Sequence, residues 1–187
     1  MKNTIRIIQP GRTGDILITL PIAYHYWLNG KDIIWPVASE FVDIFSSVVF
    51  IRDMFIYNIG SIYEHSGSFL RSLAIKHKSL NGEILDLAIG FGNPALDAEW
   101  KVSGLSFDVW KYYTTKLEYQ AKYSLPDIIV RDKVAEKNLM NLKGIKPGEK
   151  YIVVHDYGSG GRSFKFKNII DFQNYKVIEI TKTDGVP

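Results

Sequence analysis

A carboxylate that directly follows a glycine-bearing turn is the group in this chain best placed for acid–base chemistry. Asp15 comes after the turn at residues 9–14, which follows an apolar run at residues 4–8 and leads into a helical pattern. A strand, a turn and a helix in this order point backbone N–H groups and the helix dipole into the crevice at the carboxyl end of a parallel sheet, where α/β proteins hold anionic ligands. Asp15 can act there as a general base if it lies within about 3 Å of an acceptor hydroxyl. The alternative is an N-cap, whose hydrogen bonds lower the pKa of the carboxyl and make it a poorer base.

Three neighbours of Asp15 on the same turn, Arg12, Thr13 and Gly14, are candidates for substrate binding. The guanidinium of Arg12 offers a fork of donors that suits a phosphate or a carboxylate. The turn lacks both the Gly-Lys-Ser/Thr ending of a P-loop and the Gly-x-Gly-x-x-Gly of a dinucleotide fold. Ordinary turn chemistry therefore remains the alternative.

A second glycine-rich loop follows an apolar run at residues 151–154 and precedes a short helical pattern at residues 164–172. Its N–H groups can form a concavity for an anion, and its basic side chains supply charge. The candidate donor-phosphate residues are Ser159, Gly160, Arg162 and Lys165. A flexible surface loop has the same composition, so both interpretations stand. His155 and Asp156 can contact a donor or an acceptor, or can simply be solvated.

Aromatic residues are concentrated between positions 100 and 119. They are Trp100, Phe107, Trp110, Tyr112, Tyr113 and Tyr119. Such rings can stack on the apolar face of a sugar. Their near-helical spacing also fits packing in the core or against another domain.

The elements that position these residues follow a βαβ rhythm. Strands are predicted at residues 4–8, 32–37, 48–51, 54–57, 84–89, 151–154 and 177–180. Helices are predicted at residues 16–28, 39–45, 62–77 and 105–119. The first of them is expected to begin with a distorted turn at Asp15 and to run regularly from Pro21. Strands separated by helices of this length favour right-handed βαβ units around a mostly parallel, Rossmann-like sheet.

Composition excludes several classes of function. The 187 residues, 46% of them hydrophobic, can close one α/β core with a fragment of another domain. There is no cysteine, and the four histidines show no paired ligand spacing, so disulfides, thiolate catalysis and a metal centre are not expected. The net charge is +3 with basic residues spread along the chain, which argues against nucleic-acid binding.

Targeting signals are not expected either. The apolar stretches fall short of the ~20 residues that a transmembrane helix needs, and the first residues do not resemble a secretory leader. We therefore expect a cytoplasmic protein without a transmembrane segment, and peripheral contact with a membrane stays open.

Two segments resemble a known enzyme family. Gly14-Asp15-Ile-Leu-Ile-Thr-Leu-Pro21, followed by Gly30-Lys-Asp-Ile-Ile-Trp-Pro-Val37 as the next strand, resembles the heptosyltransferase-like glycosyltransferases (family 9, GT-B fold) of lipopolysaccharide biosynthesis. Tyr151-Ile-Val-Val-His155 and the loop after it resemble the entry into that family's second domain.

The resemblance implies two facing Rossmann-like domains and transfer of a sugar from a nucleotide-sugar donor to a glycan acceptor, with neither a metal nor a further cofactor. Asp15 then matches the signature aspartate proposed as general base. Lys165, or Arg162, matches a basic group near the donor diphosphate.

The domain organisation that follows is a Rossmann-like acceptor-side domain at residues 1–142, a linker at 143–150, and an incomplete start of a donor-binding domain at 151–187. Two alternatives remain. The chain can be a non-catalytic glycan- or nucleotide-binding α/β module, or a short form whose exposed second-domain segment associates with another chain.

Overall fold

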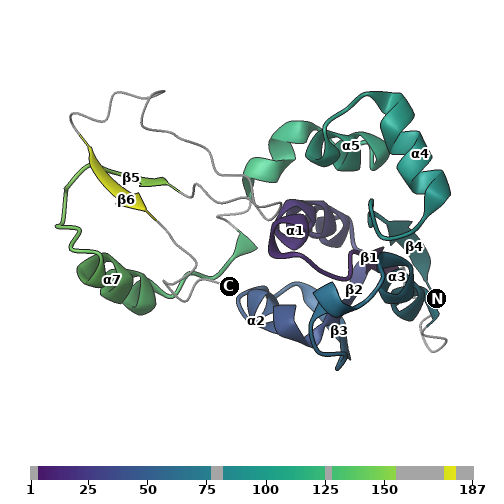
Figure 1. Ribbon diagram of the computed structural model, residues 1–187, viewed down its shortest axis with the longest axis horizontal. Helices are drawn as coiled ribbons and strands as arrows, with labels where there is room; N and C mark the ends of the chain where they lie inside the picture. The colour runs from purple at the N-terminus through teal and green to yellow at the C-terminus, as the bar shows by residue number, and fades with distance from the viewer. Residues whose placement is uncertain (1–3, 77–81, 125–127, 155–174, 180–187) are drawn as a thin grey trace. The chain divides into compact units, whose positions relative to one another are not determined.

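The computed structural model describes residues 4–76, 82–124, 128–154 and 175–179 (Figure 1). The chain forms two compact units, Met1–Val130 and Arg131–Pro187.

A parallel sheet forms the centre of the first unit. Its strands are β1 (Thr4–Ile8), β2 (Asp32–Ala38), β3 (Ile51–Tyr57) and β4 (Glu83–Asp86). They lie in the order β3-β2-β1-β4, and each neighbouring pair is parallel. The predicted α/β class and parallel sheet are confirmed in the described part of this unit.

Helices connect the strands. The α-helices are α1 (Thr13–Leu28), α2 (Val42–Phe45), α3 (Gly67–Lys76), α4 (Pro94–Ser103) and α5 (Phe107–Thr114). Short 3₁₀ segments are η1 (Ser39–Phe41), η2 (Ile62–Glu64) and η3 (Tyr119–Ser124). α1 packs beside α5 and η3, and α3 packs on β1 (Figure 1).

The core lies where β1 and β2 meet α1. Ile5, Ile7, Trp35 and Val37 are completely buried. Burial of each such side chain contributes about 1.5–3 kcal/mol, so these two strands are the most firmly held part of the unit.

The structure corrects several predicted boundaries. The helix predicted at 62–77 is α3 and begins at Gly67, and the helix predicted at 105–119 is α5 and ends at Thr114. One continuous strand, β3, replaces the two short strands predicted at 48–51 and 54–57. β4 ends at Asp86, three residues before the predicted end. α1 is helical from Thr13 through Pro21, so its regular part begins earlier than Pro21.

The second unit contains one helix and two strands among its described residues. α7 (Lys133–Leu142) is capped by Asp132, whose Oδ1 accepts hydrogen bonds from the N–H groups of Val134 and Ala135 at 3.0 and 2.9 Å. β5 (Tyr151–Val154) pairs in parallel with β6 (Lys176–Glu179). The predicted strands at 151–154 and 177–180 are thus found, the second ending at residue 179 within the described range. The interpretation as the start of a donor-binding domain stays a prediction.

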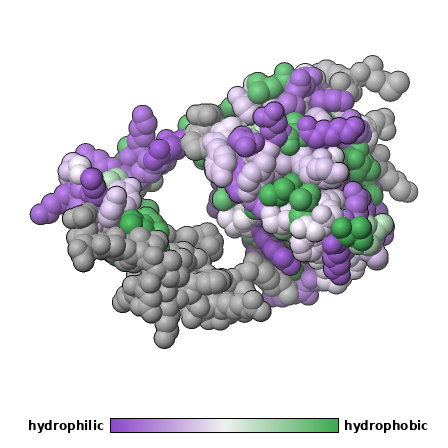
Figure 2. Space-filling model, turned by 90° about the horizontal axis from the view of Figure 1, so that it is seen from above, coloured by the Kyte–Doolittle hydropathy of each residue, from purple (hydrophilic) through white to green (hydrophobic). Residues whose placement is uncertain are grey.

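Hydrophobic side chains on the face of the first unit seen in Figure 2 are scattered among hydrophilic ones. Such a mixture is ordinary for a globular surface. None of the helices in the described ranges combines the length and apolarity that a membrane-spanning helix requires.

Candidate functional site

The loops that follow β1 and β4 meet at the carboxyl end of the sheet. Ile8 and Asp86 are register partners at the ends of these neighbouring strands, and the N–H of Leu87 donates to the Ile8 carbonyl at 3.0 Å. Farther along both loops, the Arg12 guanidinium lies 5.2 Å from the centre of the Phe91 ring. The two loops flank the point at which the strand order reverses, where open α/β sheets bind ligands.

The loop after β1 is fixed by a buried glutamine. Gln9 is completely buried, and its side-chain Nε2 donates to the carbonyl of Gly11 at 3.0 Å. The backbone carbonyl of Gln9 accepts a hydrogen bond from Trp35 Nε1 at 2.9 Å. A Cβ on Gly11 would lie only 2.8 Å from Phe41 Cε2 and 2.9 Å from Ile62 Cδ1. This loop therefore reaches the helix start in a tightly packed conformation.

Asp15 lies in the first turn of α1, two residues inside its start. The N-cap position is held by Arg12 with φ 64°, and no side chain caps the helix there. The N-cap alternative for Asp15 is therefore wrong. Its carboxylate is free of the role that would have lowered its pKa.

The environment of Asp15 shifts the pKa of its carboxyl upward. The residue is half-buried, and its Oδ2 is buried without a hydrogen-bond partner among the described residues. Burial raises the pKa of Asp15, and the charges of Lys111 and, to a smaller extent, Arg12 oppose that rise. A carboxyl with a raised pKa is better matched to general-base work near neutral pH.

Lys111 of α5 is the second charged group of this site. Lys111 is completely buried, and its Nζ donates to Gln9 Oε1 at 2.6 Å and to Thr19 Oγ1 at 3.3 Å. Nζ also lies 4.5 Å from the centre of the Phe107 ring, a cation–π contact. Burial lowers the pKa of Lys111 to about 8, and the charge of Asp15 opposes this shift.

The sequence did not identify Lys111 as a site residue. A signal was present: a single lysine stands between Trp110 and Tyr112 in an aromatic helical segment. Both neighbours are buried, and so is the lysine.

The structure brings the first set of predicted residues together. Arg12, Thr13 and Gly14 are exposed and directly precede Asp15 at the start of α1. Whether they bind substrate stays a prediction. Ser159, Gly160, Arg162 and Lys165, together with His155 and Asp156, lie outside the described residues.

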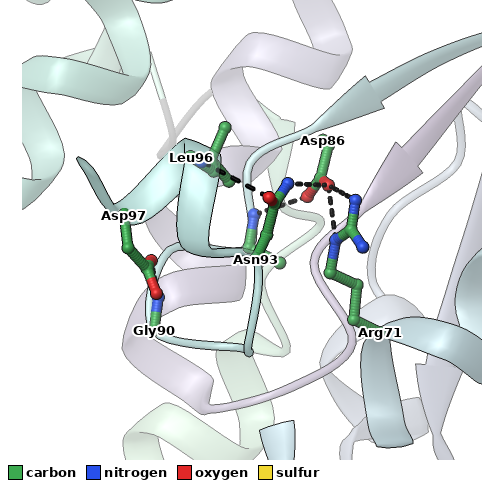
Figure 3. Close-up of polar contacts among 7 residues, drawn as sticks. Arg71, Asp86, Gly90, Asn93, Leu96 and Asp97 are labelled. Carbon is green, nitrogen blue, oxygen red and sulfur yellow. Dashed lines mark hydrogen bonds and ion pairs between the residues drawn. The ribbon is translucent and has the colours of Figure 1, made fainter. Parts of the chain in front are cut away.

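A network of polar contacts holds the loop after β4 (Figure 3). Asp86 Oδ2 accepts hydrogen bonds from Arg71 Nε at 2.6 Å and Asn93 Nδ2 at 3.3 Å, and Oδ1 accepts from the N–H of Ala88 at 3.2 Å. Asp97 Oδ1 accepts from the N–H of Gly90 at 2.8 Å. The carboxylate of Asp86 is thus engaged in shaping the rim opposite Arg12.

Most of the aromatic series serves packing. Trp110 and Tyr112 are buried, and Tyr112 donates its hydroxyl hydrogen to the Ile18 carbonyl at 2.9 Å. Trp100 Nε1 donates to the Leu105 carbonyl at 2.9 Å, and its ring meets Phe107 edge-on. Tyr113, by contrast, is 68% exposed. The packing interpretation is therefore confirmed for Trp110, Tyr112 and Trp100.

Asp15 can accept a proton in this arrangement. Two cations act on it, the exposed Arg12 and the buried Lys111. Within the described ranges, no group of three or more His, Asp and Glu side chains is placed to hold a metal ion.

Comparison of the chain with models of known protein families, with curated proteins and with solved structures gives no match. The resemblance to heptosyltransferase-like enzymes therefore depends on the residues that carry it, and membership of that family stays a prediction.

Proposed function

We propose that this chain takes part in transfer of a sugar from a nucleotide-sugar donor to an acceptor hydroxyl, with Asp15 as the general base. The observation that carries the proposal is the half-buried Asp15 carboxyl with its raised pKa at the carboxyl end of β1. Burial raises the pKa of this carboxyl and so makes it a stronger proton acceptor than a solvated carboxylate.

In the proposed step, the proton of the acceptor hydroxyl moves to Asp15 while the acceptor oxygen forms a bond to the anomeric carbon. The bond from that carbon to the diphosphate breaks, and its electron pair leaves with the nucleoside diphosphate. Arg162 and Lys165 are the residues expected to neutralise the departing charge. The exposed start of α1, with Arg12 beside it, suits an anionic part of a substrate.

The fold supports the proposal in a general way. Asp15 and Arg12 stand where the strand order of the sheet reverses, between β1 and β4. Ligands of open α/β sheets bind at such points. The segment that resembles the glycosyltransferase signature, Gly14 to Pro21, is the same segment that forms the first half of α1.

The test is transfer by the full chain. Uridine, guanosine and adenosine diphosphate sugars are each offered with an oligosaccharide acceptor, and the released nucleoside diphosphate is measured. Asp15→Asn should lower the rate by about 10²–10⁴-fold with an unchanged melting temperature to within a few degrees. Asp43→Asn, an exposed acid in the first turn of α2, is the matched control and should retain the rate. Full turnover by Asp15→Asn would remove the base assignment.

A second function is a binding module for a glycan or a nucleotide without turnover. The buried position of Asp15 Oδ2 favours it, because a buried oxygen is less accessible to an incoming hydroxyl. Calorimetric binding of the same nucleotides and oligosaccharides, without release of nucleoside diphosphate, would support this function over transfer.

A further inference from the structure

The buried ammonium of Lys111 connects two parts of the site that are far apart in sequence. Through Gln9 Oε1 it reaches the loop after β1, and through Thr19 Oγ1 it reaches α1 one turn beyond Asp15. Thr19 Oγ1 in turn donates to the carbonyl oxygen of Asp15 at 2.7 Å. A single side chain of α5 therefore supports both ends of the strand–turn–helix segment that carries Asp15.

We infer that Lys111 is a positioning residue for Asp15, because its ammonium holds Gln9 and Thr19 in place and keeps a positive charge close to the Asp15 carboxylate. The inference deepens the proposed function and rests on it for the role of Asp15. Lys111 itself does not touch the substrate in this role, since the residue is completely buried.

Stability alone does not account for a lysine at this position. Taking an ammonium out of water is costly, and a hydrophobic side chain of similar size is often neutral or better for stability in such a place. Here the ammonium is satisfied by two polar side chains and the Phe107 ring. What a hydrophobic side chain could not supply is a positive charge that acts on Asp15.

The charged groups around the pair are few among the residues described. Asp15 is the group whose charge acts on Lys111, and Lys111 and Arg12 are those that act on Asp15. On α5 itself, Asp108 pairs with Lys122 of η3 at 2.7 Å. That neighbouring charge pair is internally balanced, so the mutual influence of Asp15 and Lys111 can be measured separately.

The first experiment measures this influence without any transfer assay. The full chain is labelled with ¹³C-lysine, and the Cε signals are titrated in the wild type and in Asp15→Asn. Among the described lysines, Lys111 is the one whose pKa is lowered by burial, to about 8. In Asp15→Asn its midpoint should fall by roughly one pH unit, because the opposite charge that favours the ammonium is gone. An unchanged or higher midpoint would overturn the inference.

The second experiment follows the acid limb of the transfer rate. The acid limb is the fall of the transfer rate at low pH. Lys111→Met should move it to higher pH, since the charge that lowers the pKa of Asp15 is removed. Lys111→Arg keeps a positive charge, so its acid limb should lie closer to that of the wild type. Lys101→Met, an exposed lysine of α4, is the matched control and should leave the limb in place. An acid limb in Lys111→Met identical to that of the wild type would contradict the inference.

The two experiments separate the two claims. If no donor supports transfer, the proposed function fails, while the titration of Lys111 in Asp15→Asn still decides whether the two side chains are coupled. If Lys111→Met does not fold, the same titration decides the inference, because Asp15→Asn keeps the shape of the side chain.

Discussion

Lys111 Nζ donates a 2.6 Å hydrogen bond to Gln9 Oε1, and both residues are completely buried although 102 positions separate them. The bond joins α5 to the loop that leads from β1 into α1. Because an unpaired buried charge is far more costly than a paired one, loss of Gln9 and loss of Lys111 have different consequences.

Lys111 should make the stability of the protein rise with pH in a defined window. Its pKa is about 8 in the folded state and 10.5 in a solvated chain, so between these values the unfolded state binds more protons. The free energy of unfolding therefore rises with pH there, by about 2 kcal/mol between pH 8 and pH 10. Urea unfolding at a series of pH values measures the slope.

The window closes near pH 10 for a physical reason. Burial raises the pKa of Tyr57 and of Tyr112, so above pH 10 the folded state binds more protons than the unfolded state and stability falls. In Lys111→Met the rise between pH 8 and pH 10 should disappear, and in Lys101→Met it should remain. A rise that persists in Lys111→Met would assign it to another group.

Gln9→Leu should be more damaging than Lys111→Met. Leucine fills a similar volume but leaves the Lys111 ammonium without its shortest partner, whereas methionine at position 111 removes the charge itself. Loss of a hydrogen-bond partner of a buried charged group costs about 1.5–3 kcal/mol, and replacement of the charge by a hydrophobic side chain costs much less. Thermal unfolding of both variants at pH 7 compares them, and equal melting temperatures would contradict the asymmetry.

How far the sequence predicts this fold depends on which side chains are buried. β1 and β2 were predicted because apolar residues predominate in both segments. β3 was divided in two by Arg52 and Asp53, whose side chains are exposed because β3 lies at the edge of the sheet. α4 and α7 were not predicted, and neither contains a buried residue. Their caps, Asn93 before Pro94 and Asp132, were local signals for both helices.

The candidate site also contains one residue that the sequence predicts, Asp15, and one that it does not, Lys111. Asp15 could be found because its position depends on local order: a strand, a turn and a helix start within fifteen residues. Lys111 was missed although it stands between Trp110 and Tyr112, because a lysine in a helix ordinarily faces solvent. Its burial depends on Gln9, which belongs to a distant segment. Local patterns thus predict the carboxylate and the nearby Arg12, and tertiary packing determines the buried cation, Lys111, that also acts on Asp15.

Gly11→Ala should disturb the loop before Asp15. The added methyl group would lie 2.8 Å from Phe41 and 2.9 Å from Ile62, inside ordinary contact distance, so the loop or its neighbours must move. Overpacking of this kind costs about 1–3 kcal/mol. Gly14→Ala is the matched control, because a Cβ there meets no atom within 4 Å. Chemical unfolding distinguishes the two, and equal stability of both variants would count against a tightly packed loop.

Arg71 should matter more to stability than Arg52, although both form ion pairs. Arg71 reaches Asp86 with Nε and Nη2, both at 2.6 Å, and the Asp86 side chain is 15% exposed (Figure 3). The pair of Arg52 with Asp32 is single and lies at the surface. Arg71→Met should therefore cost roughly 1–2 kcal/mol, and Arg52→Met less than about 1 kcal/mol. Urea midpoints of the two variants measure the difference, and a larger loss in Arg52→Met would reverse the ranking.

Arg12→Gln should move the acid limb of the transfer rate to higher pH by less than Lys111→Met does. Both cations lower the pKa of Asp15, but Lys111 has the larger effect and is buried, whereas Arg12 is exposed. Salt screens exposed charges far more than buried ones. Raising the salt concentration should therefore reduce the shift caused by Arg12→Gln and leave the shift caused by Lys111→Met nearly intact. Rates measured across pH at low and high salt test both statements together. If Arg12→Gln causes the larger of the two shifts, or if its shift does not depend on salt, Asp15 responds chiefly to a group other than Lys111.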